Sequence, residues 1–186
     1  MIKLNICIDI DGTITDPYHF IPYLNELYNK NITNEECNTV FWEDLYNVKM
    51  ELMLKEFHSR YMHAYEEALL IEEAKIIINN LKEIHNLYFV TARSPHLEDV
   101  TKKWLVDNDV LDIDVHLLGS DEKIEKAKEL SCNIFIEDNP SNAVNLANEG
   151  MKVLLIETNY NKDITHKNIE RVNNWSEIND FILQYI

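Results

Sequence analysis

Apolar residues recur at two different spacings along the chain, and these spacings predict the secondary structure. After residue 70, short apolar runs typical of buried strands alternate with stretches in which apolar side chains return every three or four residues, as on one face of a helix. The expected strands are 3–8, 87–90, 113–118, 134–136 and 153–156, and the expected helices are 72–85, 95–105, 120–130, 140–149 and 175–185. This order predicts an α/β fold, with a parallel sheet covered by helices on both faces.

Residues 14–70 do not follow this alternation, because no strand pattern separates their helical stretches. Helices are indicated by two apolar stripes at helical spacing. A capping box also indicates a helix: in this motif a Thr and a Glu three residues later each accept a hydrogen bond from the other's backbone N–H. We therefore expect an all-helical unit over 14–70, inserted into a core formed by 1–13 and 71–186. The first stripe is Phe20, Leu24 and Leu27, the capping box is Thr33 with Glu36, and the second stripe is Leu54, Phe57, Tyr61 and Tyr65.

Polar residues and glycine predict where the core helices begin and end. Ser94 precedes Pro95 and Ser120 precedes the stretch to Leu130, so both serines are expected to be N-caps. Asn139 followed by Pro140 predicts another helix start, and Gly150 is expected just beyond the end of that helix.

Charge and cysteine content narrow the class of protein. The 186 residues carry a formal net charge of −16, so a nucleic acid polymer is not expected as a partner. Three widely spaced cysteines, Cys7, Cys37 and Cys132, favour reduced thiols and a cytoplasmic protein. We see no signal peptide pattern, and no apolar run approaches the roughly 20 residues that cross a membrane, so no membrane partner is expected.

Charged residues follow the predicted strands at the points where these strands end. Asp9 and Asp11 belong to the motif Asp-Ile-Asp-Gly-Thr after the first strand, and Glu137 and Asp138 follow the fourth. The carboxyl ends of parallel strands share one edge of a sheet, where ligands bind. Paired carboxylates there can hold a divalent cation and supply a nucleophile beside a group that transfers protons. The alternative is a turn in which Asp and Gly only satisfy the backbone.

The other polar residues near these strand ends have alternative interpretations. Thr91 ends the second strand. Its hydroxyl either binds a ligand or makes a hydrogen bond to the nearby backbone. Lys123 is expected in the first turn of a helix, where an anion pocket forms, although Lys126 or Lys128 could be the ligand instead. Arg93 either binds substrate or pairs with a carboxylate.

Neighbouring strand residues point in opposite directions. We therefore expect one of Glu137 and Asp138 to be a direct metal ligand and the other to support it, and we favour Asp138 as the ligand.

The ordered set of Asp9-x-Asp11-Gly12-Thr13, a strand-ending Thr91, Lys123 and the acidic pair resembles the haloacid dehalogenase superfamily of phosphotransferases. The resemblance implies a Rossmann-like core and a mobile C1 cap formed by 14–70. It implies that Asp9 is a nucleophile that forms an aspartyl-phosphate and that Asp11 is the acid and base. It further implies phosphate binding by Thr91 and Lys123, and Mg²⁺ binding by Asp9, Asp138 and the carbonyl of Asp11.

A narrower resemblance concerns the substrate. The Thr91-Ala92-Arg93 and Ile136-Glu137-Asp138-Asn139-Pro140 segments and the helical cap look like bacterial nucleotidases related to the cytosolic 5′(3′)-deoxyribonucleotidases. This implies a small phosphorylated metabolite, a nucleotide, as substrate. Independently of the resemblance, Phe41 and Trp42 lie next to an expected helix break and are candidates for a surface on which a base stacks. The alternatives are another metabolite such as a sugar phosphate, or a binding protein without catalysis. The base, the phosphate position and the oligomeric state stay open.

Overall fold

A single six-stranded parallel sheet forms the centre of the molecule in the computed structural model, which describes residues 2–110 and 112–185. Its strands lie in the order β3-β2-β1-β4-β5-β6, so β1 is central and the strand order reverses between β1 and β4. The α/β Rossmann-like class expected from the sequence is confirmed. The strands are β1 Asn5–Ile8, β2 Asn86–Thr91, β3 Asp114–Leu117, β4 Ile134–Glu137, β5 Lys152–Ile156 and β6 Ile169–Val172.

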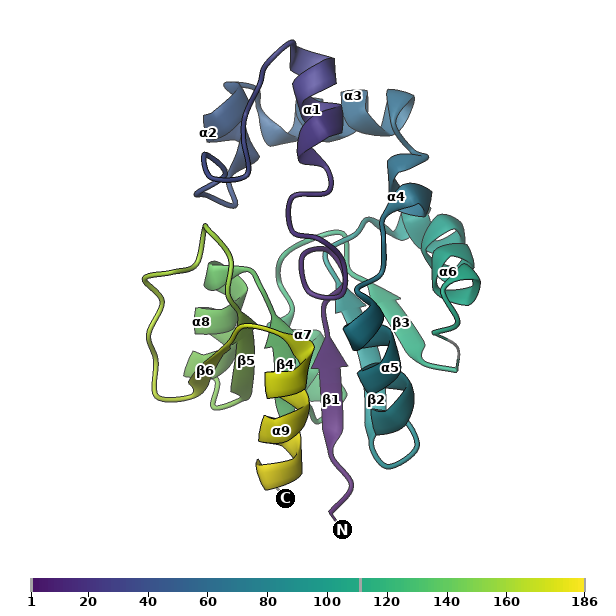
Figure 1. The fold of residues 1–186 in the computed structure, drawn as a ribbon, viewed down its shortest axis with the longest axis vertical. Helices are drawn as coiled ribbons and strands as arrows, with labels where there is room; N and C mark the ends of the chain where they lie inside the picture. The colour runs from purple at the N-terminus through teal and green to yellow at the C-terminus, as the bar shows by residue number, and fades with distance from the viewer. Residues whose placement is uncertain (1, 111, 186) are drawn as a thin grey trace.

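Alternate side chains of the strands point to opposite faces of the sheet, and each face is covered by helices (Figure 1). Ile6 and Ile8 of β1 pack in one apolar cluster with side chains of α5, α6 and α9, whereas Cys7 packs in a second cluster with α7 and α8. Burial on both faces explains why the strands read as continuous apolar runs. The covering helices are α5 Glu72–Leu81, α6 Glu98–Asp107, α7 Ile124–Glu129, α8 Pro140–Asn148 and α9 Trp175–Tyr185.

The chain between β1 and α5 forms four helices above the carboxyl edge of the sheet (Figure 1). They supply most of an apolar cluster that includes Phe20, Leu24 and Phe57, and Leu97 of the core also belongs to it. An isolated antiparallel bridge joins Thr15 to Leu70, where the segment leaves and rejoins the core. The division into units at 14–70 stays a prediction. The helices are α1 Ile21–Tyr28, α2 Trp42–Tyr46, α3 Met50–Arg60 and α4 Ala64–Glu67.

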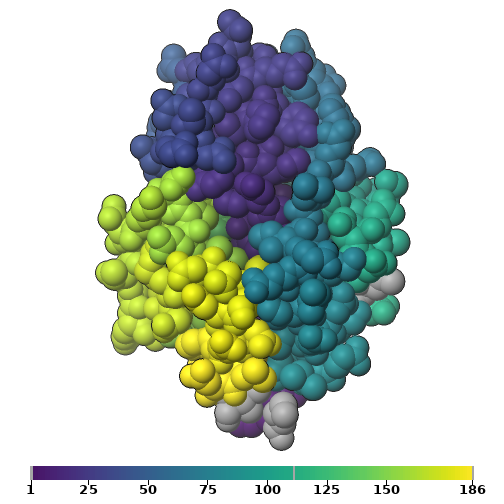
Figure 2. Space-filling view, in the orientation of Figure 1, coloured from purple at the N-terminus to yellow at the C-terminus, as the bar shows by residue number. Residues whose placement is uncertain are grey.

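The loop after β5 lies against this helical segment on one side of the molecule (Figure 2). The backbone N–H of Asn159 donates a hydrogen bond to the hydroxyl of Tyr18 at 2.9 Å, and the Asn159 side chain donates to the carbonyl of Asn34 at 2.8 Å. These bonds tie the helical segment to the core beside the carboxyl edge of the sheet.

Several expected elements differ from the structure. The sheet has a sixth strand, β6, that the sequence patterns do not predict. Ser120 does not cap α7, because that helix begins after Lys123; the Ser120 hydroxyl instead accepts a bond from Glu122 N–H at 3.4 Å within a turn. Ser94 precedes a 3₁₀ turn, Pro95–Leu97, but makes no side-chain cap bond. Asn139 does cap α8, and Gly150 follows that helix with φ of +90°.

Local patterns in the helical segment are also only partly realised. Thr33 and Glu36 form the two reciprocal bonds of a capping box, at 2.9 and 3.3 Å, but they close a turn rather than begin a helix. The expected stripe from Leu54 to Tyr65 is divided, because α3 ends at Arg60. Phe57 is buried in the apolar cluster, whereas Leu54 is 42% exposed.

None of the helices in the described ranges is long and apolar enough to cross a membrane. Cys7, Cys37 and Cys132 are free thiols. The cytoplasmic location expected from the cysteine content stays a prediction.

Candidate functional site

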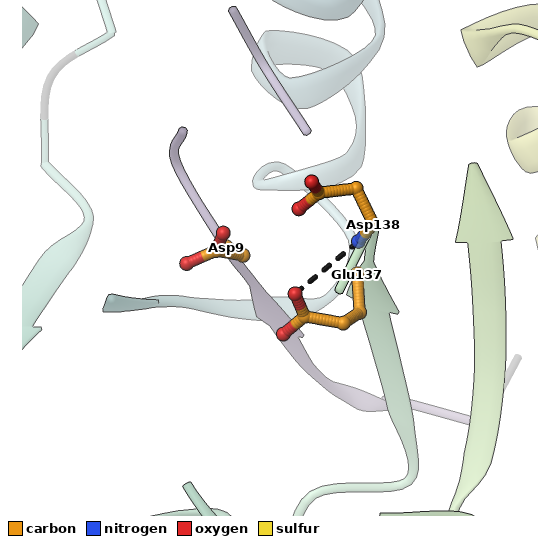
Figure 3. A group of neighbouring side chains, drawn as sticks. All are labelled: Asp9, Glu137 and Asp138. Carbon is orange, nitrogen blue, oxygen red and sulfur yellow. Dashed lines mark hydrogen bonds between the residues drawn. The ribbon is translucent and has the colours of Figure 1, made fainter. Parts of the chain in front are cut away.

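Three buried carboxylates converge where the strand order reverses. Asp9 follows β1, Glu137 ends β4, and Asp138 comes next in the chain. An oxygen of each lies within 4.8 Å of an oxygen of the other two. Figure 3 shows the three side chains gathered at this point. The sequence analysis expected the side chains of Glu137 and Asp138 to point in opposite directions, and the structure differs. Both reach this cluster, because the chain leaves the strand at Glu137 and the alternation of side chains no longer applies.

Lys123 is the cation at the centre of this cluster. Its ammonium lies 2.6 Å from Oδ1 of Asp9 and 2.8 Å from Oε2 of Glu137. The residue is 2% exposed and occupies the position just before α7 rather than the first turn of that helix. Lys126 and Lys128, the alternatives, instead pair with surface glutamates at 2.6 and 2.8 Å. Of these three lysines, the structure brings Lys123 to the carboxylates.

The second oxygen of Glu137 is also occupied. Its Oε1 accepts hydrogen bonds from the backbone N–H groups of Asp138 at 3.2 Å and Asn139 at 3.0 Å, and the first of these bonds is drawn in Figure 3. The carboxylate of Glu137 therefore connects Lys123 to the turn that carries Asp138.

The Gly12-Thr13 part of the motif shapes the space around Asp138. Gly12 has φ of +86°, and a Cβ there would lie 2.4 Å from Oδ2 of Asp138. Any other residue would meet both backbone strain and a steric clash at this position. Thr13 is fully buried, and its hydroxyl donates to Oδ1 of Asp138 at 3.1 Å. The motif thus places Asp138 as well as the two aspartates it contains.

Two residues of the loop after β5 complete the surroundings of Asp138, and the sequence analysis missed both. The hydroxyl of Tyr160 donates to Oδ2 of Asp138, and the Asn161 side chain donates to the carbonyl of Asp138 at 2.8 Å. The run Thr158-Asn159-Tyr160-Asn161 follows the fifth predicted strand. The rule that ligands bind at carboxyl strand ends would have pointed to it.

Burial dominates the electrostatics of the cluster. It raises the pKa of the Asp9 carboxyl to about 7, against the opposing effect of the Lys123 ammonium. Burial and then the charges of Glu137 and Asp9 raise the pKa of Asp138 well above its usual value. Burial also works against the charge of Lys123, but the two carboxylates outweigh it and raise the pKa of its ammonium. The buried ammonium of Lys123 thus pairs with Asp9 and Glu137, whereas Asp138 takes its hydrogen bonds from Thr13 and Tyr160.

This donor set fits a hard divalent cation. Mg²⁺ prefers carboxylate and carbonyl oxygens, and an added positive charge would favour ionisation of the crowded carboxyl groups. Thr13 and Tyr160 already orient the Asp138 oxygens, as the residues around metal ligands commonly do.

Thr91, Arg93 and Asp11 lie on the other side of Asp9. Thr91 is 1% exposed and its hydroxyl accepts a bond from the backbone N–H of Arg93 at 3.2 Å, the local bond considered for it. Arg93 pairs with a carboxylate: its Nε and Nη2 donate to the two oxygens of Asp11 at 2.8 and 2.6 Å. Of the two alternatives considered for Arg93, the structure shows the ion pair with a carboxylate, that of Asp11.

A cavity of about 460 Å³ opens in front of these groups, between the sheet edge and the helical segment. The carboxylates, Thr91, Arg93 and Lys123 line one wall. The opposite wall is mainly apolar and aromatic. It is formed by Phe20, just before α1, and by side chains of α1, α2, α3 and α4 that include Leu24, Trp42, Met53, Phe57 and Tyr65. The chain therefore offers a polar wall for an anionic group and an apolar wall for the rest of a ligand.

The structure separates the two aromatic residues expected to stack a base. Trp42 lines the cavity, and its ring also packs against Phe20 with centroids 6.1 Å apart. Phe41 is 55% exposed and is not among the residues that line the cavity.

Comparison of the sequence with known proteins relates this chain to nucleotidases. The sequence model of the family described as 5′-nucleotidase, deoxy (pyrimidine), cytosolic type C protein (NT5C) matches residues 2–185. A nucleotidase of Clostridium acetobutylicum is 38% identical over 179 residues, which cover 96% of this chain and 93% of that protein.

Solved structures share the fold at low sequence identity. A haloacid dehalogenase-like protein of Agrobacterium tumefaciens superposes with a TM-score of 0.69 at 12% identity, covering 98% of this chain and 99% of that one. A Bacillus subtilis protein assigned to the HAD hydrolases, determined with bound magnesium, has a TM-score of 0.63 at 17% identity, covering 98% and 99%.

Proposed function

The chain belongs to the NT5C family of 5′-nucleotidases and is a phosphatase of the haloacid dehalogenase superfamily, and we propose that it hydrolyses nucleoside monophosphates in a Mg²⁺-dependent reaction. The observation that carries this proposal is the contact of Lys123 with Asp9 inside a cluster of three buried carboxylates, at the base of a cavity with an apolar opposite wall.

In the first half of the proposed reaction, Asp9 is the nucleophile. A carboxylate oxygen of Asp9 forms a bond to phosphorus while the bond from phosphorus to the ester oxygen breaks. Asp11 gives its proton to the departing oxygen, which leaves as the alcohol of the nucleoside. Lys123 and the Thr91 hydroxyl hold the phosphoryl oxygens, and the ammonium offsets the charge that two anions bring together.

In the second half, water attacks the phosphorus of the aspartyl-phosphate. Asp11 takes a proton from this water, the bond from phosphorus to the Asp9 oxygen breaks, and inorganic phosphate leaves. Asp9 is restored as a carboxylate and Asp11 regains its proton, so the cycle consumes only ester and water. One pair of aspartates thus serves both halves.

Asp9, Asp138 and the backbone carbonyl of Asp11 would hold the Mg²⁺, with Glu137 supporting them. The ion supplies charge neutralisation when bound, which favours the approach of the phosphate dianion to the ionised Asp9. Thr13, Tyr160 and Gly12 fix the position of the Asp138 carboxylate beside it.

We further propose that residues 14–70 form a lid that selects the substrate. Its aromatic and methionine side chains face the polar wall across the cavity, and a nucleobase is a flat group that stacks on aromatic rings. Of the residues 14–70 that line the cavity, Asp16 and His58 are charged or polar, and a sugar phosphate would need more hydroxyl-binding groups than these. A protein that only binds phosphate esters would not need the full set of Asp9, Asp11 and Lys123.

Release of inorganic phosphate from a panel of esters tests the proposal. The panel includes 5′- and 3′-nucleoside monophosphates, sugar phosphates and p-nitrophenyl phosphate, each with Mg²⁺ and with a chelator. We expect Mg²⁺-dependent hydrolysis of nucleoside monophosphates and none by Asp9→Asn. Preference for sugar phosphates would overturn the substrate assignment, and equal rates with chelator would overturn the metal requirement.

A further inference from the structure

Arg93 holds the Asp11 carboxylate by both of its oxygens. Nε donates to Oδ2 at 2.8 Å and Nη2 donates to Oδ1 at 2.6 Å, a bidentate geometry that fixes the plane as well as the place of the carboxylate. We infer that Arg93 is a positioning residue for the proton-transfer group Asp11 rather than a ligand of the substrate. This inference rests on the proposed function, in which Asp11 is the acid and base.

The guanidinium is itself fixed by the core and by the helical segment. Nη1 donates to the hydroxyl of Thr101 on α6 at 3.0 Å, and Thr101 is fully buried. The ring of Trp104 on α6 and the ring of Tyr65 on α4 lie near the guanidinium, with distances of 5.8 and 4.9 Å from the centroids to its central carbon. A planar cation is well suited to contact aromatic rings in this way.

These contacts distinguish positioning from substrate binding. The Arg93 side chain is 2% exposed, whereas the Asp11 side chain is 29% exposed. Asp11 and Thr101 take up an N–H group on each of the three guanidinium nitrogens of Arg93. Both Arg93 and Asp11 line the cavity, but Asp11 exposes much more of its side chain there. Asp11, the more exposed of the two, is therefore the residue that contacts the substrate, and the buried Arg93 fixes the position of its carboxylate.

Position matters because the two halves of the reaction use one carboxyl group on two different oxygens. Asp11 must lie within hydrogen-bond reach of the ester oxygen and later of the water that replaces it. Fixing a reacting group in place removes an entropic part of the barrier. Lysine cannot replace Arg93 in this task, since a single ammonium cannot hold both carboxylate oxygens in one plane.

The test compares two substrates that differ in the leaving group alone, phenyl phosphate and p-nitrophenyl phosphate. Nitrophenolate leaves with little need of a proton, so loss of proton transfer affects phenyl phosphate more. The variants are Arg93→Lys, Asp11→Asn and the double variant, with Arg60→Lys as a matched control because Arg60 is exposed on α3. Steady-state kcat and KM and a melting curve are measured for each.

We expect Arg93→Lys to lower kcat for phenyl phosphate roughly 10-fold or more, within the range of general acid catalysis. The loss for p-nitrophenyl phosphate should be several times smaller, with KM within about twofold of the wild-type value. The double variant should be no slower than Asp11→Asn alone, because Arg93 can no longer affect the rate through Asp11 once the Asp11 carboxylate is absent. Arg60→Lys should match the wild type.

Three results would overturn the inference. A raised KM for both esters at unchanged kcat would make Arg93 a substrate ligand. An equal fall in kcat for both esters, accompanied by a lower melting temperature, would make it a structural residue only. Additive losses in the double variant would show that Arg93 acts independently of Asp11. A wild-type protein that hydrolyses neither ester with Mg²⁺ would defeat the proposed function and this inference with it.

Discussion

Tyr160 and Asp138 are joined by a hydrogen bond between the phenol and Oδ2 of the carboxylate, although α8 and β5 lie between them in the chain. Thr13 donates to the other oxygen of the same carboxylate. Tyr160 also packs edge to face on Tyr18 at the start of the helical segment, with ring centroids 6.3 Å apart. One side chain thus contacts both the proposed metal ligand and the base of the proposed lid.

Removing the Tyr160 hydroxyl should weaken metal binding. Tyr160→Phe keeps the ring and its packing on Tyr18 but leaves one Asp138 oxygen without its donor. Loss of a partner that orients a metal ligand commonly costs 10- to 100-fold in metal affinity, so we expect Mg²⁺ to bind roughly tenfold more weakly. Calorimetric titration with Mg²⁺ measures this, with Tyr185→Phe, which alters an exposed tyrosine, as control. Equal affinity in both variants would contradict the role given to Tyr160.

Asp9→Asn should abolish turnover without weakening the fold. An amide is a poor nucleophile and a poor Mg²⁺ ligand, and we expect a loss of well over 10-fold, more than ~1.4 kcal/mol of barrier. Burial raises the pKa of Asp9 to about 7, so stability falls as pH rises from the unfolded pKa through this value. The neutral amide lacks this effect, and the variant should melt no lower than the metal-free wild type at pH 8. Retention of more than about a tenth of the rate would exclude the covalent mechanism.

The fold was predictable wherever burial imposes a simple pattern. β1, β4 and β5 are enclosed by helices on both faces and therefore read as apolar runs. β6 lies at the edge of the sheet, and its two middle residues, Glu170 and Arg171, are not buried. A four-residue edge strand with charges at its centre carries neither an apolar run nor a clear alternation, so its sequence resembles that of a loop.

The site was predictable as far as the strand ends determine it. Asp9 and the Glu137-Asp138 pair follow two strands that lie side by side, so their meeting follows from the topology. The partner of Arg93 could not be predicted from the strand ends. Whether Arg93 binds a substrate or Asp11 depends on how α6 and α4 enclose its guanidinium. Tyr160 acts from a loop, where no periodicity places a side chain.

A pair of histidines links the helical segment to the core and should make stability depend on pH. Nδ1 of His58 on α3 lies 3.2 Å from Nε2 of His96, and Nε2 of His58 lies 3.0 Å from the Tyr65 hydroxyl. Burial, and then the neighbouring His96, lower the pKa of His58 from the usual 6.5. The unfolded chain therefore takes up a proton that the folded chain resists, and stability is lost as pH falls below about 6.5.

His58→Gln should reduce this pH dependence. Glutamine can still hydrogen-bond to Tyr65 but does not titrate. We expect the drop in melting temperature between pH 7.5 and pH 5.5 to be smaller in the variant than in the wild type, by an amount of order a few degrees. His166→Gln, which alters a histidine in the loop before β6, is the control. Parallel curves for wild type and His58→Gln would show that the histidine pair does not contribute.

Trp42 should distinguish nucleotides from simple esters. Its ring lines the cavity on the apolar wall, and stacking of a base on an aromatic ring is worth ~1–3 kcal/mol. We expect Trp42→Ala to raise KM for a nucleoside monophosphate roughly tenfold and to leave p-nitrophenyl phosphate much less affected. Phe41→Ala is the matched control, because Phe41 is the adjacent aromatic residue but is exposed and lies outside the cavity lining; it should change neither substrate.

The competing interpretation is that Trp42 only stabilises the helical segment, since it packs on Phe20. In that case its truncation leaves a void in the aromatic cluster, lowers the melting temperature and harms both substrates alike. Melting curves recorded alongside the kinetics separate the two interpretations. Equal impairment of both esters with a large fall in melting temperature would remove the stacking argument, and the preference for nucleotides would then rest on family membership alone.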